Sequence, residues 1–114
     1  MDTCLFCKIA NRERPGKIVY EDEQSVAFED INPKAPVHIL IVPRRHLATL
    51  LDANQADDGL LGHLLLVANR IARQMGIADR GFRLVINCNS EGGQAVYHLH
   101  LHLLGGRPLS WHPA

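Results

Sequence analysis

The chain has 114 residues, and twelve lysines and arginines balance twelve aspartates and glutamates, which leaves a formal net charge of zero with seven histidines uncounted. This length fits one domain over residues 1–114, and 46% hydrophobic with 21% charged residues is typical of a packed globular protein rather than a disordered chain. The neutral balance argues against a partner held by bulk charge, such as nucleic acid or an anionic membrane, and no apolar stretch approaches the roughly 20 residues that span a bilayer.

Prolines and turn residues divide the first half of the chain into short elements. Pro15-Gly16 and the pair Pro33 and Pro36 interrupt helical geometry, and Pro43 ends an apolar run. The elements predicted between them are a short helix over 4–10, strands over 18–20 and 25–28 that form a hairpin about the charged turn 21–24, and a strand over 38–42.

The second half is predicted to hold one long helix and two strands. The helix runs from about 54 to 75, because apolar residues recur at three- and four-residue spacing: Leu61, Leu64, Leu65, Ala68, Ile71, Ala72 and Met75. Asp52 with Gln55 offers a capping-box start, and Gly76 offers a C-terminal stop. Strands over 82–87 and 98–104 follow, separated by the turn-rich run 89–93. This order predicts an α+β fold, in which an antiparallel sheet of about five strands is covered on one face by the long helix.

The N-terminus and the cysteines indicate a cellular compartment. Asp2 follows Met1, and no basic segment with an apolar run comes after it, so we expect no signal peptide. Three cysteines in such a chain suggest thiols or metal ligands rather than a disulfide framework. The sequence therefore predicts a cytoplasmic protein.

Histidines and apolar residues alternate without a break from Tyr97 to Leu103. Strand geometry places His98, His100 and His102 on one face and the apolar residues on the other. That face could hold a metal through neutral imidazoles, or it could use one imidazole as a nucleophile while its neighbours position an anion. The third interpretation, that the histidines only decorate a half-exposed strand, is disfavoured by the regularity of the row.

The run from His98 to Leu104 resembles the His-x-His-x-His-x-x signature of the histidine triad (HIT) family of nucleotide-binding proteins, in which x is apolar. The resemblance covers nearly the whole chain and points to the Hint branch of that family. Its order and spacing match at 6–9, 28–33, 35–38, Val42-Pro43, Asn87, 92–94, Tyr97 and 105–108. The resemblance implies a small α+β unit, two copies of which form a homodimer with one continuous sheet.

Proteins of the Hint branch hydrolyse purine nucleoside 5′-phosphoramidates, so the resemblance implies a phosphoramidase that acts on AMP- or GMP-linked amines. His100 matches the nucleophile that attacks the α-phosphorus and forms a nucleotidyl-histidine intermediate, which water then cleaves. His102 matches the residue that contacts the phosphate. His38 matches a histidine that helps to orient the triad and relays protons to the leaving amine. A nucleophilic imidazole needs a lone pair on one nitrogen and a hydrogen bond on the other, and a backbone carbonyl could supply that bond.

The same resemblance implies which residues contact the nucleotide. Asp30 matches the acceptor of hydrogen bonds from the ribose hydroxyls, and Asn87 matches a polar contact to phosphate or ribose. The glycine-rich turn Gly92-Gly93-Gln94 can let backbone N–H groups approach phosphate oxygens. Ala95 departs from the family pattern, because many relatives carry there a serine that touches the phosphate. The apolar slot around the base matches four residues for which core packing is the alternative: Phe6, Ile9, Phe28 and Ile31.

Cys4 and Cys7 have the spacing of two metal ligands, but two small apolar residues packed in the first helix would look the same. Some HIT proteins hold a structural zinc with such a pair, a histidine after the Val-Pro segment and the first histidine of the triad. The matching residues here are Cys4, Cys7, His46 and His98. The resemblance thus implies a closed zinc site, while catalysis itself needs no metal.

Expectations also follow for Cys88, His63 and Trp111, and two alternative functions stay open. Cys88 has no partner at suitable spacing and is expected to pack within a strand, and His63 is expected on the solvent face of the long helix. In the Hint branch the C-terminal segment reaches toward the partner's active site, so Trp111 is a candidate substrate contact across the dimer.

The alternatives to a phosphoramidase are a Fhit-like dinucleoside polyphosphate hydrolase with the same nucleophile, and a nucleotide-binding adaptor whose slow hydrolysis is incidental.

Overall fold

The computed structural model describes residues 3–111. Short 3-10 turns occupy Leu50–Asp52, Gln55–Asp57 and Ser90–Gly92. The helices and strands are, in chain order, α1 (Leu5–Ala10), β1 (Ile18–Glu21), β2 (Ser25–Glu29), β3 (Val37–Pro43), α2 (Asp58–Gln74), β4 (Phe82–Ile86) and β5 (Leu101–Gly105). The predicted order of a short helix, three strands, a long helix and two strands is confirmed.

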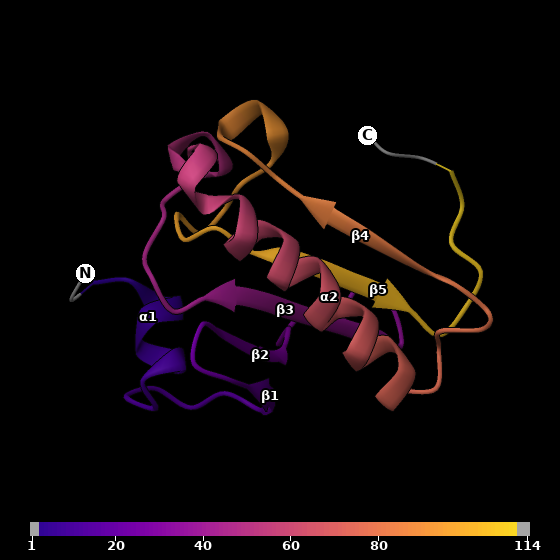
Figure 1. The fold of residues 1–114 in the computed structure, drawn as a ribbon. Helices are drawn as coiled ribbons and strands as arrows, with labels where there is room; N and C mark the ends of the chain where they lie inside the picture. The colour runs from indigo at the N-terminus through magenta and orange to yellow at the C-terminus, as the bar shows by residue number, and fades with distance from the viewer. Residues whose placement is uncertain (1–2, 112–114) are drawn as a thin grey trace.

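All five strands form one antiparallel sheet in the order β1-β2-β3-β5-β4 (Figure 1). The chain crosses over so that β5, its last strand, pairs with both β3 and β4. The register places His38 opposite Leu104 and Leu40 opposite His102. The predicted α+β fold with a five-stranded antiparallel sheet and one main helix is confirmed, and the crossover brings two histidine-bearing strands side by side.

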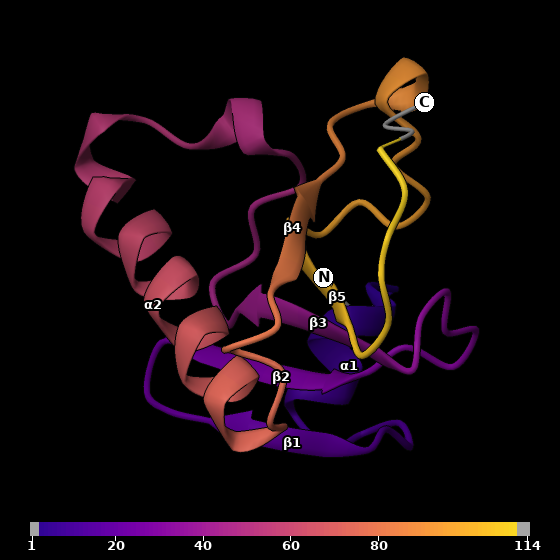
Figure 2. The ribbon, with the colours of Figure 1, turned by 90° about the vertical axis from the view of Figure 1, so that its right-hand side faces the viewer.

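The two helices cover opposite faces of the sheet (Figure 2). Helix α2 packs on the face that carries Ala27, Ile39, Ile41, Leu101 and Leu103, and all five are at least 98% buried. The shorter α1 packs on the other face, through Phe6, Ile9 and Ala10. Successive strand residues point to opposite faces, so the residues between those of the first set belong to this second core: Val26, Phe28, Leu40 and Val42. Part of the sheet face that the long helix does not cover is therefore covered by α1.

Helix α2 begins later than predicted, although it ends where Gly76 predicts. Two 3-10 turns precede it, and each is closed by a capping box, the first between Thr49 and Asp52 and the second between Asn54 and Asp57. The expected box of Asp52 with Gln55 is therefore wrong, because Asp52 closes the preceding turn instead of starting the helix. Gly76 ends the helix with φ of +73°, a left-handed conformation that suits glycine.

The histidine run is also less regular than predicted, because β5 begins only at Leu101. The Leu99 N–H donates to the carbonyl of Leu47 at 2.7 Å, so this residue pairs with a loop instead of the sheet. The alternation of faces survives nevertheless. Leu99 and Leu101 lie at most 2% exposed and line the α2 side with Leu64, whereas the rings of His98 and His100 contact Phe6 of α1.

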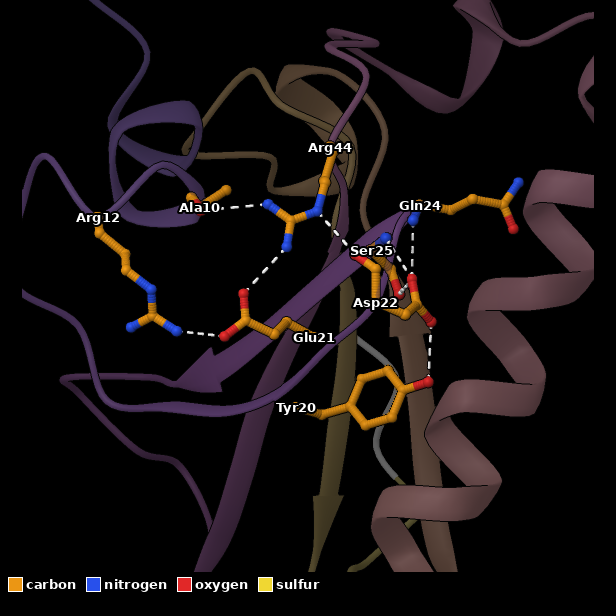
Figure 3. A network of polar contacts seen from close by, with 8 residues as sticks. All are labelled: Ala10, Arg12, Tyr20, Glu21, Asp22, Gln24, Ser25 and Arg44. Atoms are coloured by element: carbon orange, nitrogen blue, oxygen red, sulfur yellow. Dashed lines mark hydrogen bonds and ion pairs between the residues drawn. The ribbon is translucent and has the colours of Figure 1, made fainter.

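A polar network at the β1–β2 turn ties the sheet to its surroundings (Figure 3). The Asp22 carboxylate accepts hydrogen bonds from the Tyr20 hydroxyl and from the N–H and hydroxyl of Ser25. Although partial burial raises the pKa of Asp22, these bonds outweigh that effect and hold the pKa well below its usual range. We expected His63 on the solvent face of α2, but its Nε2 lies 2.7 Å from the same carboxylate.

Arg44 joins this network to the end of α1 (Figure 3). Its Nε donates to the Asp22 carbonyl at 2.8 Å, and its guanidinium also donates to Glu21 and, at 3.4 Å, to the Ala10 carbonyl. The C-terminal end of α1 is thereby held by a residue that directly follows β3. Among the helices of the described part of the chain, none is long and apolar enough to cross a membrane.

Candidate active site

His100 lies at the centre of a buried group of imidazoles on the α1 face of the sheet. Its side chain is 6% exposed, and the edge of Phe6 meets its ring with centroids 5.0 Å apart at 90°. Its Nδ1 lies 2.7 Å from the backbone carbonyl of His98. A carbonyl oxygen only accepts hydrogen bonds, so Nδ1 carries a proton, and in the neutral tautomer Nε2 keeps the lone pair. This is the backbone carbonyl bond that a nucleophilic imidazole requires on its second nitrogen.

His38 and His102 form a hydrogen-bonded chain beside His100. The backbone N–H of Lys34 donates to His38 Nδ1 at 3.0 Å, so the neutral His38 carries its proton on Nε2. That Nε2 lies 2.9 Å from His102 Nδ1, which therefore accepts. The neutral His102 ring is left with its own proton on Nε2, and its centroid lies 4.9 Å from that of His100. One ring thus offers a lone pair and its neighbour offers an N–H.

Burial keeps the imidazole rings of His38 and His102 neutral near pH 7. Desolvation lowers the pKa of His38, against the opposing effect of the Asp30 carboxylate, 3.4 Å from His38 Nε2. Desolvation, together with the nearby imidazoles of His100 and His38, lowers the pKa of His102 to about 4. Asp30, His38 and His102 lie close enough to share a metal, but the proton on His38 Nε2 already points at its neighbour.

The residues proposed for the base slot fall into two groups. Phe6, Ile9 and Phe28 belong to the second core, and each is at most 8% exposed. Their placement agrees with the packing alternative, since the two phenylalanine rings pack edge to face at 5.2 Å. Ile31 is 88% exposed and remains accessible to a ligand. Asp30 lies beside it, with Oδ1 accepting the Asn32 N–H at 2.8 Å and Oδ2 directed toward His38.

The loop after β4 is held in one shape by its own polar groups. The Gln94 side chain is buried, donates to the carbonyls of Ala48 and Val96, and accepts the N–H of Asn89. The Asn89 backbone has φ of 62° and ψ of −178°, a region that residues other than glycine rarely adopt. Asn87 adds a bond from Nδ2 to the Gly92 carbonyl.

The backbone N–H groups of this loop bear on the expected phosphate contact, which stays a prediction. The N–H groups of Gly92 and Gln94 donate to the Asn89 carbonyl, and that of Gly93 donates to Ser90. All three N–H groups of the glycine-rich turn are therefore used within the loop itself. Within residues 3–111, the N–H of Ala95 makes no such bond, and Ala95 is exposed. The N–H of Ala95, unlike those of the two glycines, is thus a donor that this loop presents.

Cys4, Cys7, His46 and His98 converge at the N-terminal end of α1, and their ligand atoms lie within 4.8 Å of one another. Nδ1 of His98 is 3.3 Å from Cys4 Sγ, 3.4 Å from Cys7 Sγ and 3.2 Å from His46 Nδ1. Zinc bonds of about 2.3 Å to sulfur and 2.0–2.1 Å to nitrogen place tetrahedral ligands about 3.3–3.6 Å apart along N–N and N–S edges. The donor set fits a closed Cys₂His₂ zinc site.

The protonation of His98 supports the same conclusion. Its Nε2 lies 2.7 Å from the Pro43 carbonyl and so carries the proton, which leaves the Nδ1 lone pair facing the cysteines. Desolvation lowers the pKa of His98, whose side chain is fully buried. Burial and the neighbouring Cys4 raise the pKa of Cys7 to about 11, so a metal would displace a proton there. Cys88 lies apart from this cluster and, contrary to expectation, follows the end of β4, half-buried.

Trp111 lies at the end of the described chain and is 82% exposed. The guanidinium of Arg83 on β4 stacks 5.9 Å from its ring centroid and donates to the Ser110 carbonyl at 2.6 Å. Ser110 and Trp111 are therefore held against the edge strand β4, and the indole is largely exposed. Whether it contacts a substrate across a dimer stays a prediction.

Sequence reasoning missed the backbone groups that fix the imidazoles. Lys34 N–H and the carbonyls of Pro43 and His98 each assign one histidine tautomer. No side-chain pattern marks such groups, because every residue except proline carries the same N–H and carbonyl. The proline-flanked stretch before β3 was recognisable as a turn, but its contact with His38 was not.

Comparisons with known proteins agree with this fold. The family model of the HIT domain matches residues 11–109. The purine nucleoside phosphoramidase of Escherichia coli (strain K12) is 51% identical over 105 residues, which cover 92% of this chain and 88% of that protein. The crystal structure of a HIT family hydrolase from Legionella pneumophila Philadelphia 1 is similar with a TM-score of 0.96 and 52% identity, covering 98% of this chain and 100% of that one. A histidine triad protein from Clostridium difficile has a TM-score of 0.95 and 47% identity, covering 98% and 96%.

Proposed function

Because this chain belongs to the HIT domain family, whose members of similar structure include hydrolases, we propose that it is a purine nucleoside phosphoramidase. Its substrates would be amines linked through nitrogen to the phosphate of AMP or GMP. The observation that carries the proposal is His100, a buried imidazole with Nδ1–H held by a carbonyl at 2.7 Å. The 51% identity to the Escherichia coli phosphoramidase supports the choice of substrate.

In the first step, His100 Nε2 attacks the α-phosphorus with its lone pair. A P–Nε2 bond forms, the P–N bond to the amine breaks, and the amine leaves with that electron pair and a proton taken up from water. The nucleotide stays on His100, whose ring is then cationic, while Nδ1–H remains bonded to the His98 carbonyl. In the second step, water attacks phosphorus and releases a proton to the solvent, and the P–Nε2 electron pair returns to the ring. The products are the free amine and AMP or GMP.

His102 and His38 would assist from the side of the phosphate. With His102 Nδ1 occupied by His38 Nε2–H, the proton on His102 Nε2 is available to a phosphate oxygen or to the departing nitrogen. An amine leaves poorly as an anion, and general acid catalysis typically contributes about 10²–10⁴-fold. The order of donors, from Lys34 N–H through His38 to His102, runs toward the substrate.

The nucleotide itself would be held by the groups around these rings. We propose that Asp30 accepts hydrogen bonds from the ribose hydroxyls, that Ile31 lies against the purine, and that the Ala95 N–H donates to the phosphate. Phe6, Ile9 and Phe28 would form the packed wall behind the base. The loop residues Asn87, Gly93 and Gln94 would support the phosphate side, and Trp111 would approach the substrate from a second subunit.

A zinc ion would complete the Cys4, Cys7, His46 and His98 cluster as a structural site. Bound by four protein ligands, such an ion has no open position for substrate, so its contribution is to hold α1 against the histidine segment. No step of the reaction would pass through it.

The chain would act as a cytoplasmic homodimer and as one HIT domain. Four large apolar side chains are 37–75% exposed: Leu51, Leu65, Leu66 and Ile86. An apolar groove between α2 and β4, lined by Leu61, Leu65 and Ile86 among others, lies beside the free edge of β4. A second copy that pairs there would extend the sheet, and sedimentation of the purified protein would give the dimer mass.

One assay separates the three candidate functions. The purified protein is incubated with an adenosine 5′-phosphoramidate, a diadenosine polyphosphate and ADP side by side. We expect turnover of the phosphoramidate above all, loss of activity by orders of magnitude in His100→Ala, and normal turnover in His63→Gln, a histidine outside the site. Preferred cleavage of the diadenosine compound would favour the Fhit-like alternative, and binding without turnover would favour the adaptor. Near-normal turnover by His100→Ala would reject the mechanism.

A further inference from the structure

We propose that the cluster of Cys4, Cys7, His46 and His98 positions the nucleophile, so that a metal held there sets the orientation of His100 as well as bracing the fold. The inference rests on the proposed function, because it takes His100 to be the nucleophile. It concerns residues of this chain only, and the metal itself contacts no substrate.

The first connection between the cluster and the nucleophile is His98 itself. Its fully buried ring donates Nε2–H to the Pro43 carbonyl and turns Nδ1 toward the two sulfur atoms. Its own backbone carbonyl accepts Nδ1–H of His100 at 2.7 Å. The ring and the carbonyl belong to one residue, so a ligand bond that fixes the ring also fixes the acceptor that assigns the His100 tautomer.

The second connection runs through α1. This helix has six residues, far fewer than the roughly 12–15 that make an isolated helix even marginally stable, so tertiary contacts must hold it. Cys4 is its N-cap and Cys7 lies in its first turn, while Phe6 between them packs edge-on against His100 at 5.0 Å. Two metal ligands therefore flank the aromatic ring that forms one wall of the nucleophile's site.

Both connections can be loosened without dissolving the fold. The C-terminal end of α1 keeps its bond from Arg44 to the Ala10 carbonyl and the burial of Ile9 and Ala10. The larger core between α2 and the sheet contains none of the four cluster residues. Removal of the metal should thus free the start of α1 and the irregular segment 98–100, and leave the sheet and α2 in place.

The chemical consequence concerns which nitrogen of His100 carries the proton. When the His98 carbonyl is not held, the imidazole can adopt the other tautomer, in which Nε2 is protonated and has no lone pair for attack. Residues that orient a reactive ligand through one hydrogen bond typically contribute about 10–100-fold. We expect kcat to fall by about that factor on metal removal. Asp30 and Ile31 precede β3 and lie outside both connections, but Phe6 belongs to the proposed wall behind the base, so KM should rise as well.

The experiment compares zinc-loaded protein, protein stripped by a chelator, and stripped protein with zinc restored. In each state kcat, KM and far-UV circular dichroism are measured, and NMR of ¹⁵N-labelled imidazoles reports whether His100 holds a slowly exchanging Nδ1 proton. We expect the stripped protein to keep its secondary structure, lose kcat and lose the Nδ1–H signal, and we expect zinc to restore both. His46→Cys, which preserves four ligands, should recover kcat relative to His46→Ala, and Cys88→Ala serves as the cysteine control.

Three results would overturn the proposal. The first is a metal-free protein with unchanged kcat and an unchanged His100 Nδ1 proton. The second is global unfolding on stripping, which would make the cluster a folding element and not a positioning one. The third is equal kcat in His46→Cys and His46→Ala. If instead His100→Ala kept its activity, the proposed function would fail, while the NMR signal of His100 would still test the connection to the metal.

Discussion

Acidification should destabilise this protein through His102 well before its carboxylates are protonated. Burial and two neighbouring imidazoles lower the pKa of His102 to about 4 in the folded chain, whereas an ordinary histidine has a pKa of 6.5. In the unfolded chain His102 therefore binds a proton as the pH falls through 6.5, and in the folded chain it stays neutral until about pH 4. Over this window the unfolded state binds more protons, so the free energy of unfolding falls as the pH falls.

The size of the effect follows from the two pKa values. Between pH 7 and pH 5 the unfolded chain takes up most of one proton at this position and the folded chain takes up very little, which costs about 2 kcal/mol of stability. Below about pH 4 the folded ring is protonated as well, and the contribution stops growing. His38, whose pKa is lowered by burial in the same direction, adds a slope of the same sign.

The assay is a urea titration at pH 7, 6 and 5 on the parent protein and on His102→Asn, both saturated with zinc. The asparagine side-chain oxygen can still accept His38 Nε2–H but cannot bind a proton in this range. The parent should lose about 2 kcal/mol more than the variant between pH 7 and pH 5, and the contributions of all other groups should cancel. Parallel curves for the two proteins would refute the reasoning, since His102 would then titrate alike in the folded and unfolded states.

The loop after β4 supports two further predictions. Asn89→Gly should raise the free energy of unfolding by about 1 kcal/mol, because φ of 62° with ψ of −178° is a conformation that glycine adopts freely, and a urea titration that shows no gain would contradict the strain. Gln94→Leu should lower stability by about 2–3 kcal/mol, since three backbone groups lose their buried amide partner, and it should raise KM more than it lowers kcat. An unchanged KM in steady-state assays would separate the loop from substrate binding.

The sequence pattern predicted which helices and strands form, but not the residues at which they begin. Alternation from Tyr97 to Leu103 assigned the correct face to each histidine, because the leucines on the other side are buried under α2. It did not predict where β5 begins, because the Leu99 N–H pairs with Leu47, which lies 52 positions earlier in the chain. The start of α2 was misplaced for a related reason. Capping boxes of the same residue types can close a 3-10 turn or start a helix, and local sequence does not distinguish them.

In the candidate site, too, the sequence predicted some features and not others. The histidine and cysteine side chains could be matched to the family signature from the sequence. The structure brings His38, His100 and His102 into one group and the four metal-ligand candidates into another. The glycine-rich turn could not be judged from the sequence, because its N–H groups can bond within the loop, as they do here to the carbonyls of Asn89 and Ser90. Glycine indicates backbone freedom, but it does not indicate which backbone groups stay unpaired.

In the proposed reaction, a chain with no net charge would attack a phosphoryl group because its imidazoles are held in complementary tautomers. The His98 carbonyl leaves a lone pair on His100 Nε2, and His38 Nε2–H leaves a proton on His102 Nε2. Those two rings lie 4.9 Å apart, so one phosphoryl group can meet a nucleophile and a hydrogen-bond donor together. If either tautomer were reversed, two lone pairs or two protons would face the phosphate, and either attack or donation would be lost. The decisive groups, Lys34 N–H and the His98 carbonyl, belong to the backbone, so the site depends on how the segments before β3 and before β5 are held.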